Sequence, residues 1–348
     1  MSSDDLIRID TPGAPDGGPE AAQPRPRSAR PARPARVRIQ RRALHGVLLL
    51  DKPLGLSSND ALQKAKWLLR AEKAGHTGTL DPLATGLLPL CFGAATKFSQ
   101  VSLDADKGYR ATVQLGVRTA TGDAEGEVLA TRPVAVDAAA VAAACAAFTG
   151  PIEQVPPMHS ALKHQGKALY EYARAGVTIE RAARAVTIHR IDIIDWQPEQ
   201  ARLVIDVLCS KGTYIRTLAE DIGERLGCGA HLSGLRRTRS GPVGIDRAVT
   251  LEALAAMSET EREACLQPPD VLLADWPRIC LPAAEAARFL TGLRRRVTHP
   301  DCAQVRVYGP EPRALLGSAH VQAGELIADR LLSPSEVQAL LNSEESTT

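Results

Sequence analysis

The 348-residue chain is poor in aromatic side chains, which make up 3% of it. RNA-binding domains that stack bases on a sheet use rows of aromatic residues, so this composition argues against such a platform. Long apolar stretches are also missing, since no segment approaches the ~18 uninterrupted apolar residues that a membrane helix needs. The first twenty residues contain no apolar core typical of a secretory signal. We therefore expect a cytoplasmic protein without a membrane segment.

Cysteine is present but never clustered. The seven cysteines are scattered, and the closest pair, Cys265 and Cys280, lies 15 positions apart, so no CxxC spacing exists. The eight histidines form no HExxH motif. The sequence therefore predicts no metal site and no disulfide framework, as is usual in a reducing compartment.

The net charge of +2 hides an uneven distribution. The first 45 residues hold nine arginines and five acids, whereas the other 303 residues hold 33 basic and 35 acidic groups. A nucleic-acid site on the body of the protein must therefore be a local patch, because the bulk charge does not supply one.

The length allows about two domains. Residues 1–42 predict a disordered tail, with eight arginines and no acid in its last twenty positions and no apolar periodicity; it is either a solvated tail or a loose RNA-binding arm. Three prolines within 267–278 indicate a linker. This leaves a main domain over 43–266, a small unit over 279–335 and a flexible C-terminus over 336–348.

Strand-like and helix-like patterns follow one another in irregular order along the main domain, which favours an α+β fold over a doubly wound sheet. The predicted strands cover 46–51, 87–91, 109–117, 185–195 and 202–209. The predicted helices cover 58–70, 138–148, 166–175 and 213–226. In the small unit we expect a helix over 283–290 and short strands over 304–307 and 326–328.

A glycine-rich loop over 75–86 carries the most informative acid, Asp81. The proline after Asp81 biases this residue to an extended conformation and presents its carboxylate on a loop between a helix and a strand. From the residues alone, a capping aspartate before a helix that starts with proline is the favoured interpretation.

Five segments, in order, resemble the TruB family. The loop Gly75-His-Thr-Gly-Thr-Leu-Asp-Pro-Leu-Ala-Thr-Gly86 resembles its signature loop, although Thr79 stands where alanine is commoner. The other four are Gly46-Val-Leu-Leu-Leu-Asp-Lys-Pro53, Lys107-Gly-Tyr-Arg110, Ser210-Lys-Gly-Thr-Tyr-Ile-Arg-Thr217 and Gly229-Ala-His-Leu-Ser-Gly-Leu-Arg-Arg237. The matches span about residues 43–250; the arginine-rich tail lies outside them.

The resemblance implies a pseudouridine-synthase fold with a mixed, largely antiparallel sheet, followed by a small, mainly β PUA-like RNA-binding domain over 279–335. It implies isomerisation of uridine to pseudouridine at position 55, in the T-loop of tRNA. This chemistry needs no redox step and no group donor, so neither a cofactor nor a metal is expected. The implied partner is the T-arm of tRNA, bound by a monomer without a guide RNA.

The resemblance also assigns roles to residues. Asp81 is the implied catalytic carboxylate, Arg216 the cation that keeps it ionised, and Tyr109 the tyrosine that stacks on the target base. Alone, Arg216 reads as an exposed helix arginine and Tyr109 as a half-buried strand tyrosine.

Further residues are expected to contact the RNA. His76 resembles the histidine that fills the space left by the flipped base, and Tyr214 and Leu235 match positions that line the base pocket, although Leu235 alone reads as a core residue. The remaining candidates for substrate contact are Lys52, Lys163, Lys167, Arg236, Arg237, Arg239 and Arg294 to Arg296.

Three other functions compete with this prediction. A non-catalytic RNA-binding protein would not need Asp81, Tyr109 and Arg216 together. A pseudouridine synthase for another RNA would share the same loop. A hydrolase with Asp81 as phosphoryl acceptor would need a magnesium site, and no Asp-x-Asp pair lies near Asp81.

Overall fold

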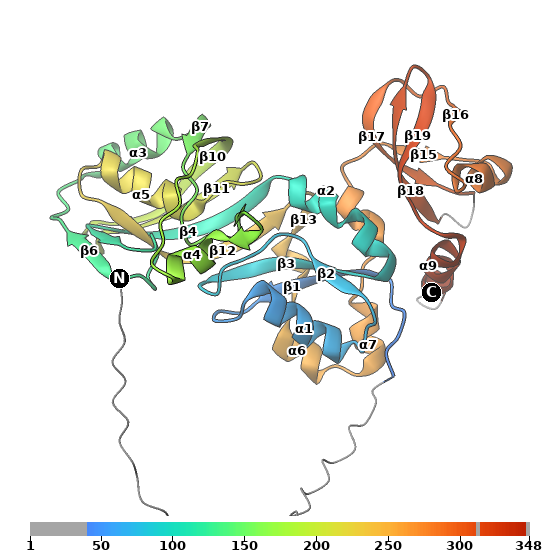
Figure 1. Cartoon of the computed structure of the whole chain (residues 1–348), viewed down its shortest axis with the longest axis horizontal. Coiled ribbons are helices and arrows are strands. Elements are labelled where there is room, and N and C mark those ends of the chain that lie inside the picture. The colour runs from blue at the N-terminus through green and yellow to red at the C-terminus, as the bar shows by residue number, and fades with distance from the viewer. Residues whose placement is uncertain (1–39, 311–313, 346–348) are drawn as a thin grey trace, which may run out of the picture. The chain divides into compact units, whose positions relative to one another are not determined.

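The structure is a computed structural model that describes residues 40–310 and 314–345 (Figure 1). The tail predicted over residues 1–42 therefore lies almost wholly outside the described residues. Its last residue is already part of the fold, because the Arg42 N–H donates to the Arg70 carbonyl and Arg42 forms a β-bridge with Ala71. Arg41 also contacts the fold, since its Nη1 donates to the Ala71 carbonyl at 3.1 Å.

A ten-stranded sheet forms the centre of the main domain, with the path β14-β1-β3-β12-β4-β11-β10-β7 and with β2 and β13 attached to β3 and β12. Only the β1–β14 and β3–β12 pairs are parallel. This confirms the predicted α+β fold with a mixed, largely antiparallel sheet. The strands are β1 (Gly46–Lys52), β2 (Ala74–His76), β3 (Ala84–Phe92), β4 (Lys107–Leu115), β7 (Gly150–Gln154), β10 (Arg184–Gln197), β11 (Arg202–Cys209), β12 (Ala230–Ser240), β13 (Val243–Gly244) and β14 (Val249–Thr250).

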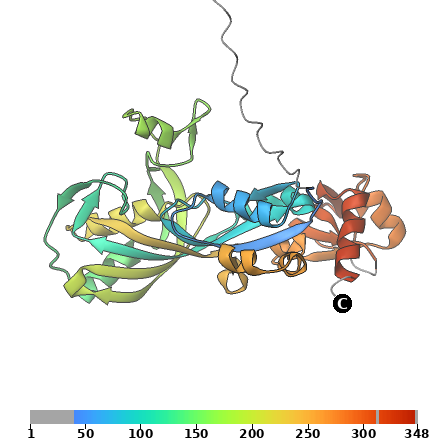
Figure 2. The same cartoon turned by 90° about the horizontal axis from the view of Figure 1, so that it is seen from below.

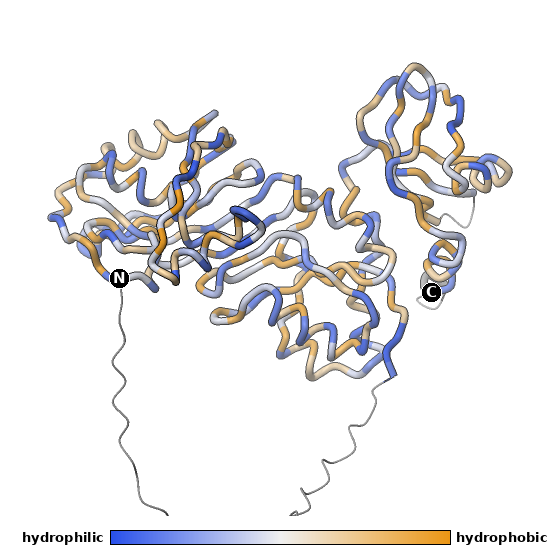
Figure 3. The backbone as a smooth tube through the Cα atoms, in the orientation of Figure 1, coloured by the Kyte–Doolittle hydropathy of each residue, from blue (hydrophilic) through white to orange (hydrophobic). Residues whose placement is uncertain are grey.

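The apolar run in β1 is explained by burial on both faces of the sheet. Val47 and Leu49 pack in one core cluster, while Leu48 and Leu50 pack in another on the opposite face, since successive side chains of a strand point to opposite sides. The second face is covered by α1 (Ser58–Leu68) and α6 (Leu251–Ala256), and α7 (Glu259–Ala264) follows. Figure 3 shows hydrophobic stretches along the strands of the sheet.

The other end of the sheet is covered by α3 (Ala138–Ala147) and α5 (Ile215–Arg225), which pack on β4, β10 and β12. The helix predicted over 213–226 is confirmed, and Ile215, Leu218 and Ile222 form its apolar stripe, since all three are buried there. None of the helices in the described ranges is long and apolar enough to traverse a bilayer.

A small hairpin and helix project from the sheet between β7 and β10 (Figure 2, green). They are β8 (Lys163–His164), β9 (Lys167–Ala168) and α4 (Leu169–Arg174), so the helix predicted over 166–175 is shorter than expected. A second hairpin joins β5 (Val117–Thr119) to β6 (Val128–Thr131).

The C-terminal unit is mainly β, as predicted. Its five strands are arranged in the order β15-β17-β18-β19-β16, and helix α8 (Ala283–Phe289) buries Phe289 against them. The strands are β15 (Arg278–Cys280), β16 (Arg295–Arg296), β17 (Cys302–Tyr308), β18 (Leu315–Gln322) and β19 (Glu325–Leu331).

Two segments expected to be loose are packed. The predicted linker 267–278 contains the 3₁₀ helix η4 (Pro269–Leu273), whose Leu272 and Leu273 are buried in the core. The remaining elements are η1 (Gly93–Phe98), α2 (Ser99–Asp104), η2 (Pro198–Gln200) and η3 (Ile245–Arg247).

The prediction of a flexible C-terminus over 336–348 was wrong for its larger part, because Pro334–Glu345 form helix α9. Its first turn is capped, since the Ser333 N–H donates to Glu336 at 2.6 Å and the Glu336 N–H donates to the Ser333 hydroxyl at 3.3 Å. Lys97 of the main domain pairs with Glu336 and donates to the Leu331 carbonyl. Leu340 is buried.

Gly86 marks the closest approach of β3 to β12. It has φ +99°, and a Cβ there would lie 2.3 Å from the Arg237 carbonyl oxygen. We predict that Gly86→Ala lowers the free energy of unfolding by roughly 2–4 kcal/mol, because β12 must move away from β3.

Gly227→Ala is the matched control, since Gly227 has φ +79° with open space around it. It should cost only about 1 kcal/mol of backbone strain. Urea unfolding of both variants measures the difference, and equal losses would contradict the close approach.

Candidate active site

The loop that carries Asp81 is held by a serine at the start of helix α1. The buried Ser58 hydroxyl accepts a hydrogen bond from the Leu80 N–H at 2.7 Å and donates to the Leu80 carbonyl at 3.1 Å. The Asp81 carbonyl accepts from the Ala84 N–H at 3.0 Å, which closes the turn into β3. One hydroxyl thus fixes the residue immediately before the carboxylate. In the sequence Ser58 could be taken only as a helix cap.

The Asp81 side chain is 48% exposed, and its Oδ2 lies 3.1 Å from Nη2 of Arg216. The Arg216 side chain is only 8% exposed, although it lies beside the apolar stripe of α5. The structure therefore brings the predicted acid and its predicted cation together. The interpretation of Arg216 as an exposed helix arginine was wrong, because α5 begins inside the site.

Arg216 is held by three further groups. Its Nη1 donates to the Thr121 carbonyl at 3.1 Å and its Nη2 to the His159 carbonyl at 2.5 Å. Nη1 also lies 3.3 Å from Oδ2 of Asp123, whose side chain is 6% exposed. A buried guanidinium between two carboxylates is a charge-compensated arrangement.

Sequence reasoning missed Asp123. It follows Thr121 and Gly122 in a turn, where an aspartate is ordinary, and nothing in the chain distinguishes it from any other turn aspartate. Its role becomes visible only where β5 returns beside β12, since Asp123 forms a bridge with Leu232.

A cavity of about 230 Å³ opens beside Asp81. Its wall includes five predicted site residues besides Asp81, namely Tyr109, Arg216, Tyr214, Leu235 and Arg237. The rest of its lining comes from the Asp81 loop, from β3, from the segment 103–107, from residues 160–161 and from the turn before α5. Residues from five separate stretches of the chain therefore converge on one small space.

Tyr109 and Tyr214 both face this cavity. Tyr109 lies in β4 between Val207 of β11 and Arg237 of β12. Burial raises its pKa, and the charge and hydrogen bonding of Arg237 act against that rise. Both phenols are therefore neutral at physiological pH, because burial raises the pKa of Tyr214 as well.

Tyr214 is fixed through its backbone. Buried Gln154 accepts from the Tyr214 N–H at 3.0 Å and donates to its carbonyl at 3.3 Å. Leu235 pairs with Ala84 of β3 and Ala111 of β4, which places it on the cavity wall. An apolar side chain and two aromatic rings beside one carboxylate form a slot for a flat, partly polar group.

Four predicted site residues do not line the cavity. His76 lies half-buried in β2, where burial lowers its pKa and its Nδ1 has no hydrogen-bond partner among the described residues. Lys163 lies exposed in the projecting hairpin. Arg236 forms a bidentate pair with Asp51 at 3.0 and 2.6 Å. Lys52 is fully buried and donates to the Pro53 and Leu56 carbonyls.

Two of the predicted RNA contacts are thereby corrected. Lys52 and Arg237 cannot reach a phosphate from the surface, since both side chains are enclosed and bonded to backbone carbonyls. The sequence pattern alone suggested that both side chains are exposed, because long basic side chains are mostly exposed in proteins.

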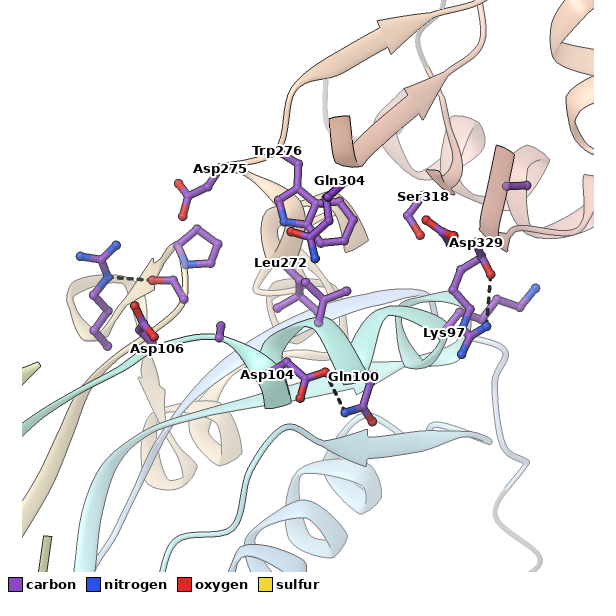
Figure 4. Close-up of a pocket in the computed structure, with 18 of the residues that line it drawn as sticks. Lys97, Gln100, Asp104, Asp106, Leu272, Asp275, Trp276, Gln304, Ser318 and Asp329 are labelled. Atoms are coloured by element: carbon purple, nitrogen blue, oxygen red, sulfur yellow. Dashed lines mark hydrogen bonds between the residues drawn. The ribbon is translucent and has the colours of Figure 1, made fainter. Parts of the chain in front are cut away.

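A larger cavity, of about 690 Å³, lies between the main domain and the C-terminal sheet. Figure 4 shows Gln100 and Asp104 of α2 on one side of it and Ser318 and Asp329 of the C-terminal unit on another. Asp104 pairs there with exposed Lys211, and Asp329 with His320. The larger cavity thus contains no carboxylate held by a buried cation, and the chemistry is concentrated at Asp81.

Comparison with known proteins agrees with this site. A model described as TruB family pseudouridylate synthase (N terminal domain) matches residues 66–215. A protein of Verminephrobacter eiseniae named tRNA pseudouridine synthase B is 62% identical over 317 residues, which are 89% of this chain and 95% of that protein. The chain belongs to the TruB family of pseudouridylate synthases.

Other matches extend this relationship. A model described as tRNA pseudouridylate synthase B C-terminal domain matches residues 216–274. A tRNA pseudouridine synthase B of Cupriavidus pinatubonensis is 61% identical over 303 residues, covering 85% of this chain and 96% of that protein. The TruB loop, the segment of Tyr109 and the start of α5 all lie inside the first matched region.

Solved structures share the fold. An archaeal box H/ACA Nop10–Cbf5 complex matches with a TM-score of 0.62 and 25% identity over 86% of this chain and 88% of that one. A Cbf5–Nop10–Gar1 complex matches with a TM-score of 0.65 and 25% identity over 88% and 89%. The small, mainly β C-terminal unit is consistent with the PUA-like domain expected from the sequence.

Lys52 makes the stability depend on pH. Burial lowers its pKa from 10.5 to about 8, against the charge of Asp81, which raises it. Between these values the unfolded chain binds a proton that the folded chain does not, so stability rises with pH. We predict that raising the pH from about 7.5 to about 9.5 adds about 2 kcal/mol to the unfolding free energy through Lys52.

Urea unfolding at both pH values measures this gain, which should be smaller by that amount in Lys52→Met. Lys64→Met, on the exposed face of α1, is the control and should keep the wild-type gain. An unchanged gain in Lys52→Met would show that Lys52 titrates normally.

Proposed function

We propose that this protein isomerises uridine to pseudouridine at position 55, in the T-loop of tRNA, with Asp81 as the catalytic carboxylate. The observation that carries the proposal is the pairing of half-exposed Asp81 with buried Arg216 at the mouth of a small cavity. The relatives named tRNA pseudouridine synthase B support the substrate class.

Asp81 acts on the nucleotide from a fixed position. The reaction breaks the bond between N1 and the ribose, turns the base and rejoins it through C5, so a negatively charged group is needed beside the sugar or base. Arg216 compensates that charge without enclosing the carboxylate, since nearly half of the Asp81 side chain stays accessible. Asp123 fixes the far side of the guanidinium.

The cavity suits one base rather than a duplex. Its 230 Å³ and its mixed lining of tyrosine, leucine and charged side chains fit a single base turned out of the RNA. Tyr109 provides the stacking face, and Tyr214 and Leu235 complete the pocket. His76 lies on β2 outside the cavity wall, where it can fill the space that the base leaves in the RNA.

The RNA itself is held outside the cavity. Lys163 in the projecting hairpin and Lys211 at the cavity rim are exposed cations that can reach phosphates. Arg236, 43% exposed on its bond to Asp51, lies on the same strand as Leu235. The T-arm of tRNA is the proposed partner, bound by a monomer without guide RNA in the bacterial cytoplasm, where tRNA is found.

A non-catalytic RNA-binding role is the main competing function. Binding alone would not require Arg216 to be buried between Asp81 and Asp123, because an unneeded buried ion network costs stability. The network therefore favours the enzyme.

We predict that Asp81→Asn abolishes pseudouridine formation in an unmodified tRNA transcript while tRNA affinity stays within about threefold, because the amide keeps the shape but not the charge. Asp106→Asn, an exposed acid paired with His189, is the matched control and should keep activity. Pseudouridine mapping after single-turnover reaction gives the readout. An active Asp81→Asn enzyme would remove the proposed mechanism, whereas modification at another uridine would change only the substrate.

We predict that Asp123→Asn slows the single-turnover rate by about 10- to 100-fold, because Arg216 loses one of its two carboxylates and is held less firmly. Affinity for tRNA should change little, since Asp123 is buried. Asp206→Asn, paired with exposed Arg110 on the outer side of β4, is the control. Weakened binding with an unchanged rate would show instead that Asp123 shapes the RNA surface.

A further inference from the structure

Arg237 is the most fully enclosed cation in the part of the chain that the structure describes, apart from Lys52. It is 1% exposed and lies in β12, directly opposite Tyr109 of β4 on one side and Gly86 of β3 on the other. A side chain in this place forms part of the cavity wall, between Tyr109 and the loop that carries Asp81.

The guanidinium binds both sides of the Asp81 loop. Its Nε donates to the Leu87 carbonyl at 2.6 Å, after the loop, and its Nη2 donates to the Gly78 carbonyl at 3.3 Å, before it. A Cβ added at Gly78 would come within 3.4 Å of Nη1, so the loop backbone lies directly against the charge.

No carboxylate within the described ranges pairs with Arg237. The charged groups that face it are the lysines Lys52 and Lys107 and the half-buried His76, and its charge lowers the pKa of each. A buried charge without a counter-ion is costly. The negative ends that meet it are the Leu87 and Gly78 carbonyl oxygens and the hydroxyl of Tyr109, its cross-strand partner in β4.

We infer that Arg237 is a positioning residue that holds the Tyr109 hydroxyl and the Asp81 loop in one fixed arrangement and faces the Tyr109 oxygen with a positive charge. This inference rests on the proposed roles of Asp81 and Tyr109. This role replaces the expectation that Arg237 contacts RNA. It also explains why an arginine, with its rigid fork of donors, occupies a core position that a leucine could otherwise fill.

The pKa of Tyr109 is consistent with the position of Arg237 beside it. Burial raises the pKa of Tyr109, and both the charge of Arg237 and its hydrogen bond oppose this rise. Removing the charge while keeping the volume should therefore raise the pKa of Tyr109 further, and this consequence can be measured without any turnover.

The first test is a double-mutant cycle under single-turnover conditions with tRNA transcript. We expect Arg237→Gln to slow the reaction by about 100-fold, with tRNA affinity within about threefold. Arg110→Gln, at the neighbouring position on the outer side of β4 and 51% exposed, is the matched control and should keep the wild-type rate.

The background of the cycle is Tyr109→Phe. If Arg237 acts through the Tyr109 hydroxyl, adding Arg237→Gln to Tyr109→Phe should slow the remaining reaction by less than about 10-fold. A full 100-fold loss in that background would overturn the inference, because Arg237 would then act independently of the hydroxyl.

The second test follows the phenol itself. In protein labelled with 3-fluorotyrosine, whose phenol ionises at lower pH, ¹⁹F NMR resolves the five tyrosines, and Tyr109→Phe identifies one signal. Its titration should move to higher pH in Arg237→Gln and stay near the wild-type value in Arg237→Lys, which keeps the charge. An unchanged titration in Arg237→Gln would contradict the inference.

If a thermal unfolding assay shows that Arg237→Gln does not fold, Arg237→Lys is the variant that tests the inference. The lysine keeps the charge but cannot bind Gly78 and Leu87 together, so we expect near-normal Tyr109 titration with a rate lowered by about 10-fold. A displaced titration in this variant would overturn the inference. Failure of the proposed function is seen separately, as activity in Asp81→Asn, since the titration does not depend on turnover.

Discussion

The guanidinium of Arg216 binds segments that lie far apart along the chain. It binds the Thr121 carbonyl, the His159 carbonyl, Asp123 and Asp81. A buried guanidinium must have its donors and its charge satisfied, otherwise its desolvation is not offset. The turn after β5, the segment before the projecting hairpin and the loop that carries Asp81 are therefore all held to the start of α5.

The second constraint is the sheet around β12. This strand runs parallel to β3 and antiparallel to β4, so it carries Leu235 and Arg237 between the strand that follows Asp81 and the strand that carries Tyr109. Gly86 allows the backbones of β3 and β12 to approach. Asp81 is thus placed by a loop, but the loop is placed by strands, which hold the site in a fixed geometry.

The two arginines of the site do different work. Arg216 opens onto the cavity, faces two carboxylates and leaves Asp81 accessible. Arg237 is almost fully buried in the cavity wall, binds two carbonyls and pairs across the strands with Tyr109. Their separation places one positive charge beside the acid and another beside the tyrosine.

Much could be predicted from the sequence because it depends on local chemistry. The apolar stripe of α5, the continuous apolar run of β1 and the glycine-rich loop with Asp81 each follow from spacing and residue type. The strand β12 could not, because Arg236, Arg237 and Arg239 interrupt any alternation, and only neighbouring strands on both sides make it a strand.

The C-terminal helix α9 was missed although its cap, Ser333 with Glu336, is a local signal, whereas its pairing with Lys97 comes from the main domain. By itself the sequence determined the family, the loop that presents Asp81 and the elements whose periodicity is local. The tertiary structure alone decided which basic residues are buried, that Asp123 belongs to the site and that Arg237 faces Tyr109. Burial and partnership are properties of chain segments that meet in space, and no spacing along the chain encodes them.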